Sequence, residues 1–342
     1  MRLQISKKVN ASDWDTKICL IGGSIFHSSI WADYIVATFP NTVPQFITLL
    51  SNNGELLGAA LGFQNYSKHK LIARWTKRLW FDAMPVVRNN DKNALRQFLQ
   101  LLHNYAYNSG CIELLVGSYA SHKGSSELKE LGFKLTKRLE FELQLEHSEH
   151  ELWRRMAHKR RKNIKKAIRM GVTIHDLPIE KGIYELRRLQ AETAKRILER
   201  GGPDLTPKVQ YAQDPVRILV ESDFGRIVGA SIDGTVVSAS LFTCFNGLIY
   251  HLLSGHSQRA FETQAPTLLL WEKIKQYRNE GAKKFNLGGC KADAINEDSP
   301  EHGVYVYKKA FGSQCWQCVT GKKILRKTNY KIINMAKDIL GR

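Results

Sequence analysis

Residues 281–312 read GAKKFNLGGCKADAINEDSPEHGVYVYKKAFG, and this stretch decides how the rest of the chain is interpreted. It opens with a short apolar strand, expected over residues 285–287, which ends at Gly288 and Gly289. Because two successive residues lack side chains there, a ligand or another backbone segment can approach closely. A polar loop follows the two glycines.

The end of the stretch predicts a second extended segment over residues 304–309. In a strand, successive side chains point to opposite faces. One face would carry Val304, Val306 and Lys308, and the other Tyr305, Tyr307 and Lys309. One of the two lysines must therefore point inward or into a cleft.

A helix is expected ahead of this stretch, over residues 266–280. Pro266 suits its first turn, and an apolar face continues through Ile274 and Tyr277 to a stop at Gly281.

The order of helix, G-x-x-x-F-N-L-G-G strand, loop and G-V-Y-x-Y-K-K-x-F-G resembles the C-terminal half of the FemABX-type family, within the broader GNAT-like acyltransferases. These are lipid II aminoacyltransferases that build the peptidoglycan interpeptide bridge. The family helix carries Trp-Glu, as Trp271 and Glu272 do here, and its closing segment reads approximately Phe-Lys-x-x-Phe. Tyr307, Lys308 and Phe311 match that segment, with Tyr in place of the first Phe. The resemblance implies that Lys308 is catalytic and that Tyr307 contacts substrate; an edge-strand lysine without a role is the alternative.

The order of expected elements is similar in the two halves of the chain, whose 342 residues suffice for two domains. Asn-Gly and Asp-Gly pairs at 53–54, 233–234 and 246–247 predict hairpins between strands. A helix is expected over 93–109, and strands over 217–221, 227–232, 236–245 and 248–253. With the resemblance, this order predicts an α/β (α+β) fold of two tandem GNAT-like domains, 1–147 and 148–342, each a mixed, largely antiparallel sheet flanked by helices.

The net charge of +19 indicates an anionic partner, and its distribution is uneven. The first 145 residues contain 17 basic and 11 acidic residues, whereas the remainder contains 34 and 21. A basic linking helix is expected over 149–170, where nine of the sixteen residues from Arg154 to Arg169 are Lys or Arg. The positive charges of such a helix repel one another unless an anion binds there. Arg161, Lys165 and Lys166 are therefore candidate nucleic-acid contacts, the alternative being a solvated face.

Two further phrases carry the resemblance into the second half. Arg161-x-Asn-Ile-x-x-Ala-x-x-x-Gly-Val resembles the helix that opens the second domain of the family, and Thr193-Ala-x-Arg196 with the later Tyr211 resembles its acceptor-side region. The resemblance implies that Arg196, Lys208 and Tyr211 bind the acceptor. Arg196 could instead only terminate a helix, where the dipole favours a cation.

The strand over 248–254 is where the general acyltransferase fold separates two strands and exposes backbone N–H groups. Tyr250, His251 and Ser254 are polar groups on that strand. Tyr250 and Ser254 are candidate substrate contacts, and His251 is a candidate general base, with a core histidine as the alternative. Lys308 would hold a phosphate or the developing oxyanion. Acyl transfer to an amine requires no metal.

These observations predict a Fem-type acyltransferase that moves an aminoacyl group from aminoacyl-tRNA to an amine of a cell-envelope or secondary-metabolite precursor. An N-acyltransferase that uses acyl-CoA or acyl-carrier protein is the second reading, and a non-enzymatic RNA-binding protein is the third. No tightly bound cofactor is expected; aminoacyl-tRNA or acyl-CoA would be the co-substrate. The expected partners are tRNA and an anionic or phosphorylated acceptor that bears an amine.

The expected location is the cytoplasm, including the inner membrane surface. No run of residues is long and apolar enough to cross a bilayer, and the first ten residues lack an apolar signal core. The basic, amphipathic segment 322–342 could contact a membrane surface, although packing of its apolar face on the protein is the alternative.

Overall fold

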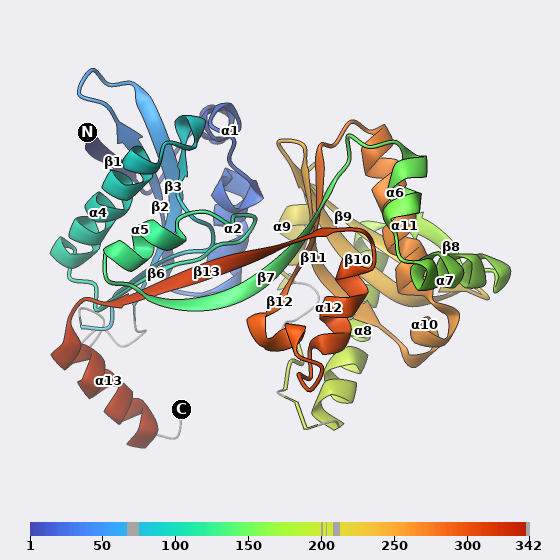
Figure 1. The fold of residues 1–342 in the computed structure, drawn as a ribbon. Helices are drawn as coiled ribbons and strands as arrows, with labels where there is room; N and C mark the ends of the chain where they lie inside the picture. The colour runs from blue at the N-terminus through green and yellow to red at the C-terminus, as the bar shows by residue number, and fades with distance from the viewer. Residues whose placement is uncertain (67–74, 200, 203, 208–212, 340–342) are drawn as a thin grey trace. The chain divides into compact units, whose positions relative to one another are not determined.

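The computed structural model describes residues 1–66, 75–199, 201–202, 204–207 and 213–339 (Figure 1). The chain divides into two compact units. The first comprises Met1–Arg138 and Gln317–Arg342, and the second Leu139–Trp316. This division differs from the expected domains 1–147 and 148–342, because the C-terminal segment belongs to the first unit. Both boundaries also fall inside strands rather than in linkers.

The first unit has a sheet with the strand order β1-β2-β3-β4-β6-β13, and β5 pairs with β3. Its elements are β1 (Arg2–Ser6), α1 (Ala11–Leu20), α2 (Ser29–Thr38), β2 (Thr42–Leu50), β3 (Leu56–Asn65), β4 (Arg78–Phe81), β5 (Val86–Val87), α4 (Lys92–Asn108), β6 (Glu113–Val116), α5 (Ser125–Glu130), β13 (Gln314–Ile324) and α13 (Lys327–Ile339). Strand β7 (Lys134–Gln144) begins in this unit and ends in the second.

Helix α4 shows how the sequence determines this unit. Asp91 accepts hydrogen bonds from the backbone N–H groups of Asn93 and Ala94, which caps the helix. The apolar positions at three- and four-residue spacing are buried, among them Phe98 and Leu102. The predicted helix over 93–109 is therefore confirmed.

The second unit has a sheet with the strand order β7-β12-β11-β10-β9-β8. Its remaining elements are α6 (Glu149–Arg155), α7 (His158–Arg169), β8 (Thr173–Asp176), α8 (Ile179–Glu199), α9 (Val216–Glu221), β9 (Gly225–Ile232), β10 (Thr235–Phe245), β11 (Leu248–His256), α10 (Gln258–Thr263), α11 (Ala265–Asn279), β12 (Lys284–Lys291) and α12 (His302–Lys309). The pairs β9–β10 and β10–β11 are antiparallel and β11–β12 is parallel, so the sheet is mixed, as expected.

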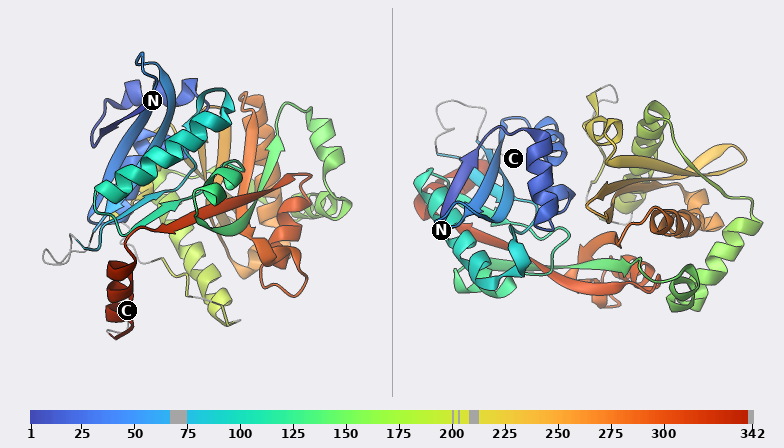
Figure 2. Two further views of the ribbon diagram at one scale, coloured as in Figure 1. Left: turned by 60° about the vertical axis from the view of Figure 1, so that its left-hand side comes forward. Right: turned by 90° about the horizontal axis from the view of Figure 1, so that it is seen from above.

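Helices cover both faces of this second sheet. A side chain at Gly255 would collide with the backbone of α8, whereas Phe242 packs against Tyr277 of α11. Figure 2, in its right-hand view, shows α8 and α11 on opposite sides of the strands. The site described below is built where this sheet meets α12.

The hairpins follow the predicted turns. The two residues between β9 and β10, Asp233 and Gly234, both have positive φ, as do Asn246 and Gly247 between β10 and β11. Positive φ at both central residues gives the turn the twist that paired strands require. Because this requirement is local, Asp-Gly and Asn-Gly reveal the hairpins in the sequence.

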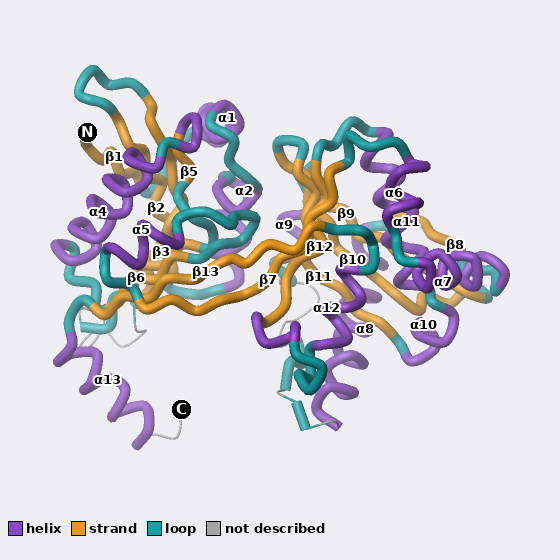
Figure 3. Tube along the Cα trace, viewed as in Figure 1, coloured by secondary structure: helices purple, strands orange, loops and turns teal. Residues whose placement is uncertain are grey.

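The predicted extended segment over 304–309 is wrong, because these residues belong to helix α12 (Figure 3). The alternation of Val and Tyr favours a strand locally. Tertiary packing overrides this preference: Tyr305 contacts Phe141 edge to face at 5.8 Å, and Tyr307 contacts Phe311 at 5.4 Å. The second of these contacts has the four-residue spacing of a helix.

Two other expectations are corrected. Residues 217–221, predicted as a strand, lie in helix α9, whose one buried face carries Val216 and Leu219 at helical spacing. The basic segment forms two helices rather than one, because Met156 and Ala157 have extended backbone angles between α6 and α7. The buried side chains of Leu152 from α6 and Ile164 from α7 then pack into one core. Among the described residues, no helix is both long and apolar enough to span a membrane.

Candidate functional site

The site begins where two parallel strands stop pairing. Residues 248–250 of β11 pair with residues 284–286 of β12, and the pairing ends there although both strands continue. Gly288 interrupts the regular backbone of β12 with a φ of +73°. The strand separation expected near 248–254 is therefore present. Beyond it, the backbone N–H and C=O groups of β11 and β12 no longer pair with each other.

Lys308 reaches this point from α12. Its Nζ donates a hydrogen bond to the carbonyl oxygen of Gly289 at 2.9 Å. A β-carbon added at Gly288 would lie 3.3 Å from the same Nζ and 3.2 Å from the carbonyl oxygen of His251, which explains the glycine there. Lys309, one residue on, is exposed and donates to the hydroxyl of Tyr305. The structure therefore turns Lys308 toward β12, although from a helix.

His251 lies close to this ammonium group. Its ring stacks on Phe242 at 4.9 Å, and its Nε2 lies 3.1 Å from the hydroxyl of Ser240. Burial, and then the charge of Lys308, lower the pKa of His251 to about 3. The ring is therefore neutral at physiological pH. An imidazole with so low a pKa accepts a proton poorly, which weakens the predicted role of His251 as general base.

The other two candidates on β11 differ in accessibility. Tyr250 is buried, and its hydroxyl donates to Glu140 at 2.9 Å. Because neighbouring strand residues face opposite sides, Tyr250 points away from the face of His251. Direct substrate contact by Tyr250 is thus incompatible with this geometry. Ser254 is half-buried and pairs with Ser240. A register shift between Leu241 and Phe242 interrupts the alternation, so Ser254 lies on the same face as His251.

Tyr307 is half-buried, and its hydroxyl is enclosed by the second unit. The guanidinium of Arg160 lies 4.3 Å from the centre of its ring, and burial raises the pKa of the Tyr307 hydroxyl to about 12. The nearby Thr267 lowers this pKa slightly, although the two hydroxyls form no hydrogen bond of standard geometry. Tyr307 therefore supports α12 from inside the unit. Whether its ring edge also touches a substrate stays a prediction.

Arg160 was not among the predicted site residues. It is only 8% exposed, and it links α7 to α11 through a 3.5 Å hydrogen bond to the Thr267 hydroxyl. It lies four residues before Ile164 and seven before Ala167, which places it on the buried face of α7. That spacing could have identified it in the sequence.

The three candidate nucleic-acid contacts on α7 have different environments. One terminal nitrogen of Arg161 donates to the carbonyl oxygens of Trp153, Arg154 and Met156. Arg161 therefore caps the last turn of α6, and this internal role conflicts with the expected phosphate contact. Lys165 and Lys166 are exposed. Their exposure is compatible with an anionic partner.

The acceptor-side candidates are described only in part. Arg196 donates to the carbonyl oxygen of His256 at 2.7 Å and lies 5.0 Å from the ring of Phe261. These contacts fix the end of β11 on α8, so Arg196 does more than terminate a helix. Lys208 and Tyr211 lie outside the described residues.

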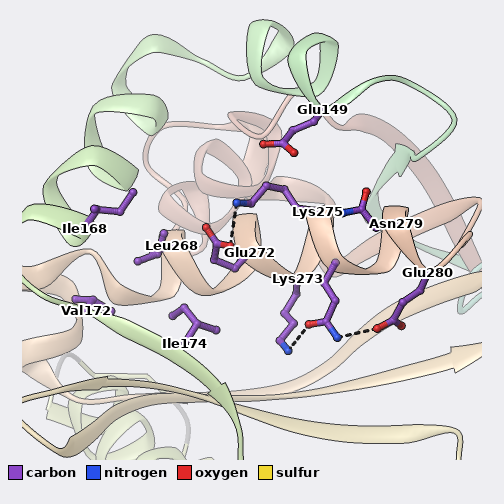
Figure 4. Close-up of a pocket in the computed structure, with 11 residues that line it drawn as sticks. Glu149, Ile168, Val172, Ile174, Leu268, Glu272, Lys273, Lys275, Asn279 and Glu280 are labelled. Carbon is purple, nitrogen blue, oxygen red and sulfur yellow. Dashed lines mark hydrogen bonds and ion pairs between the residues drawn. The ribbon is translucent and has the colours of Figure 1, made fainter.

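A separate pocket of about 700 Å³ lies beside α11 (Figure 4), and neither Lys308 nor His251 lines it. Its apolar side consists of Ile168, Val172, Ile174 and Leu268. Its polar side chains largely engage one another: Glu272 pairs with Lys275, and Gln276 bonds both Lys273 and Glu280. This internal pairing is typical of a structural surface. The described residues also contain no cluster of His, Cys, Asp and Glu suited to a metal ion.

Residues 158–309 match the family model described as an acetyltransferase (GNAT) domain. That range covers α7 to α12 and includes both Lys308 and His251. None of the curated proteins matches the chain in sequence.

Solved structures share the fold over nearly the whole chain. FemX is 16% identical, with a TM-score of 0.77 over 97% of this chain and 100% of that chain. The C-terminal domain of a putative lysylphosphatidylglycerol synthetase from Agrobacterium fabrum is 11% identical, with a TM-score of 0.53 over 96% and 97%. A tandem GNAT protein from the clavulanic acid biosynthesis pathway is 13% identical, with a TM-score of 0.54 over 95% and 99%.

These comparisons confirm the predicted resemblance and the predicted fold class of tandem GNAT-like domains. The domain match also supports the enzyme class, an acyltransferase of the GNAT type.

Proposed function

We propose that this protein transfers an aminoacyl group from aminoacyl-tRNA to an amine of a cell-envelope or secondary-metabolite precursor, and that Lys308 stabilises the developing oxyanion. The observation that carries the proposal is the position of the Lys308 ammonium, which is held 2.9 Å from the Gly289 carbonyl oxygen where β11 and β12 separate. A fixed positive charge at the point where the two strands stop pairing suits a reaction in which negative charge develops on a carbonyl oxygen.

In this reaction the acceptor nitrogen attacks the ester carbon of the aminoacyl group. A C–N bond forms, the C–O bond to the tRNA ribose breaks, and the proton lost by the nitrogen is balanced by the proton gained by the ribose hydroxyl. Because the pKa of His251 is about 3, its imidazole is not a strong base in the resting site. The amine should therefore bind in its neutral form and transfer its proton toward the leaving oxygen.

The tRNA part of the proposal is supported by the outer face of α7. Exposed cations occupy five positions there, Lys159, Lys162, Lys165, Lys166 and Arg169. No acidic residue occurs between Leu152 and Asp176 to neutralise them. A phosphate backbone is the partner that such a face binds best. The fold shared with a putative lysylphosphatidylglycerol synthetase also favours an aminoacyl group over a simple acyl group, because lysyl is an aminoacyl group.

The second candidate is N-acyl transfer from acyl-CoA or an acyl-carrier protein. The acetyltransferase domain match favours it, as does the tandem GNAT neighbour, which is described as the form without AcCoA. Against it, residues 256–266, which follow β11, contain no glycine. Typical CoA enzymes hold the pyrophosphate with a glycine-rich loop at a helix N-terminus. A peripheral contact with a membrane surface, which the exposed Ile332 and Met335 of α13 would suit, is compatible with either donor.

The deciding experiment supplies the two donors separately. The pure protein is incubated with total charged tRNA, or with acyl-CoA, and an extract that contains amine acceptors is then added. We expect loss of the aminoacyl group from tRNA only when acceptor is present, and no consumption of acyl-CoA. Consumption of acyl-CoA alone would favour the second candidate. Binding of tRNA without deacylation in any extract would favour a non-enzymatic RNA-binding protein.

A further inference from the structure

A row of three polar side chains crosses the apolar interior of the second unit. Glu140, Tyr250 and Asn286 come from the neighbouring strands β7, β11 and β12 and are 2%, 3% and 2% exposed. One carboxylate oxygen of Glu140 accepts from the Tyr250 hydroxyl, and the other accepts from the Asn286 side-chain nitrogen, both at 2.9 Å. Hydrogen bonds to a buried carboxylate are strong because they are charge-assisted.

The side-chain oxygen of Asn286 faces the backbone of the site. Its Oδ1 accepts a hydrogen bond from the backbone N–H of Gly288 at 2.8 Å. The carboxylate of Glu140 fixes the orientation of the amide, because only the amide nitrogen can donate to it. The oxygen must then face Gly288, at the residue where β12 leaves regular strand geometry. The carbonyl oxygen of the following residue, Gly289, accepts a hydrogen bond from Lys308.

We propose that Asn286, oriented by Glu140, is a positioning residue for Lys308. A continuous series of bonds runs from Glu140 through Asn286 and the Gly288 peptide to the carbonyl that holds the ammonium. Fully satisfied buried networks of this kind fix one conformation, and here that conformation sets where the positive charge lies. The consequence for catalysis rests on the proposed function, whereas the placement of Lys308 does not.

The test exchanges donor and acceptor. In Asn286→Asp, the side chain can no longer donate to Glu140, and repulsion between the two carboxylates displaces it from the Gly288 N–H. The double variant Glu140→Gln with Asn286→Asp restores the bonds in reverse. Its new amide at position 140 donates to the new carboxylate at position 286, which still accepts from Gly288, and the amide oxygen still accepts from Tyr250. We expect kcat to fall at least tenfold in the single variant and to return to within about threefold of wild type in the double variant, with KM nearly unchanged throughout.

Tyr250→Phe is the matched control. It removes a bond to the same buried carboxylate, but it does not touch the connection to Gly288. We expect a lower melting temperature with turnover within about threefold of wild type. Equal loss of turnover in Tyr250→Phe and Asn286→Asp would overturn the proposal, as would a double variant no better than the single one. If the aspartate variant does not fold, Asn286→Ala removes the acceptor without adding charge and takes its place.

A second measurement does not depend on activity. Limiting amounts of an amine-acylating reagent are applied, and the labelling of Lys308 is measured by mass spectrometry against the exposed Lys309 in the same peptide. We expect the ratio to change at least threefold in Asn286→Asp and to recover in the double variant. An unchanged ratio would refute the positioning role. If wild type transfers nothing from either donor, the proposed function fails, while the labelling ratio still judges this inference.

Discussion

Lys308 and the outer lysines of α7 have the same side chain in two opposite settings. Lys308 is half-buried, bonded to a carbonyl and close enough to His251 to depress its pKa. Lys165 and Lys166 project into water, where each charge is screened. Where the fold removes water around a lysine, its charge acts strongly on the groups nearby, such as the His251 imidazole. Exposed lysines instead act together, through the summed field of many charges.

The largest expected effect comes from Lys308, the half-buried lysine of this comparison. Lys308→Met keeps the packing of the stem and removes only the ammonium group, so turnover should fall by ~10² or more while folding persists. Lys309→Met is the control, because that side chain is exposed and donates to the hydroxyl of Tyr305 rather than to the site. Turnover and melting temperature are measured for both. Equal activity in the two variants would remove the distinction between enclosed and exposed lysines.

The exposed charges should respond to salt instead. Reversal of Lys165 and Lys166 to Glu should weaken tRNA binding by about tenfold or more and reduce the dependence of affinity on salt. Arg161 is left intact, because it caps α6 and its loss would damage the fold. Binding is measured by filter retention at several salt concentrations. A tRNA affinity that changes neither with the charge reversal nor with salt would favour acyl-CoA over aminoacyl-tRNA as the donor.

Two histidines on β11 make stability depend on pH. Burial and then Lys308 lower the pKa of His251 to about 3, and burial and then Arg196 lower that of His256 to about 4. The unfolded chain takes up these protons below pH 6.5 and the folded chain does not. Stability should therefore decrease as the pH falls from about 6.5 toward 4, by about 1.4 kcal/mol per pH unit for each histidine. Denaturant unfolding between pH 7 and 5 measures the slope, which should become shallower in His256→Gln.

The smallest effect separates backbone strain from contact with Lys308. Gly288 and Gly234 have nearly the same φ, +73° and +74°, but only Gly288 has neighbours that an added β-carbon would meet. Each Ala variant should lose roughly 1 kcal/mol of stability from strain. Turnover should fall only in Gly288→Ala. If Gly234→Ala impairs turnover equally, strain rather than the position of Lys308 explains the loss.

Local chemistry explains which elements the sequence could predict. Asp233 with Gly234, and Asn246 with Gly247, accept positive φ and so mark hairpins without help from the rest of the fold. Helix α11 has Pro266 in its first turn and stops before Gly281, and these signals are also local. The Trp271-Glu272 and Tyr307-Lys308 phrases indicated the FemX-like fold because they occur in the right order between such elements.

The candidate site was predictable only where a side chain's role follows from its own segment. Lys308 was identified from a motif, although its predicted backbone conformation was wrong. Asn286 interrupts an apolar strand, whereas Glu140 lies in a strand that alternates charged and apolar residues. Neither pattern can show that the two side chains meet across 146 positions of sequence. Arg160 and Arg161 are adjacent and chemically identical, yet one packs on Tyr307 and the other caps α6.

The sequence by itself determined the hairpins, the amphipathic helices, the one-signed surface of α7 and the family resemblance, because each depends on residues near one another in the chain. Only the tertiary structure decided that residues 302–309 form a helix, that the segment after Trp316 belongs to the first unit, and that a buried carboxylate orients Asn286. These outcomes depend on contacts between distant segments. Their free energy exceeds the small local preferences that a sequence pattern records.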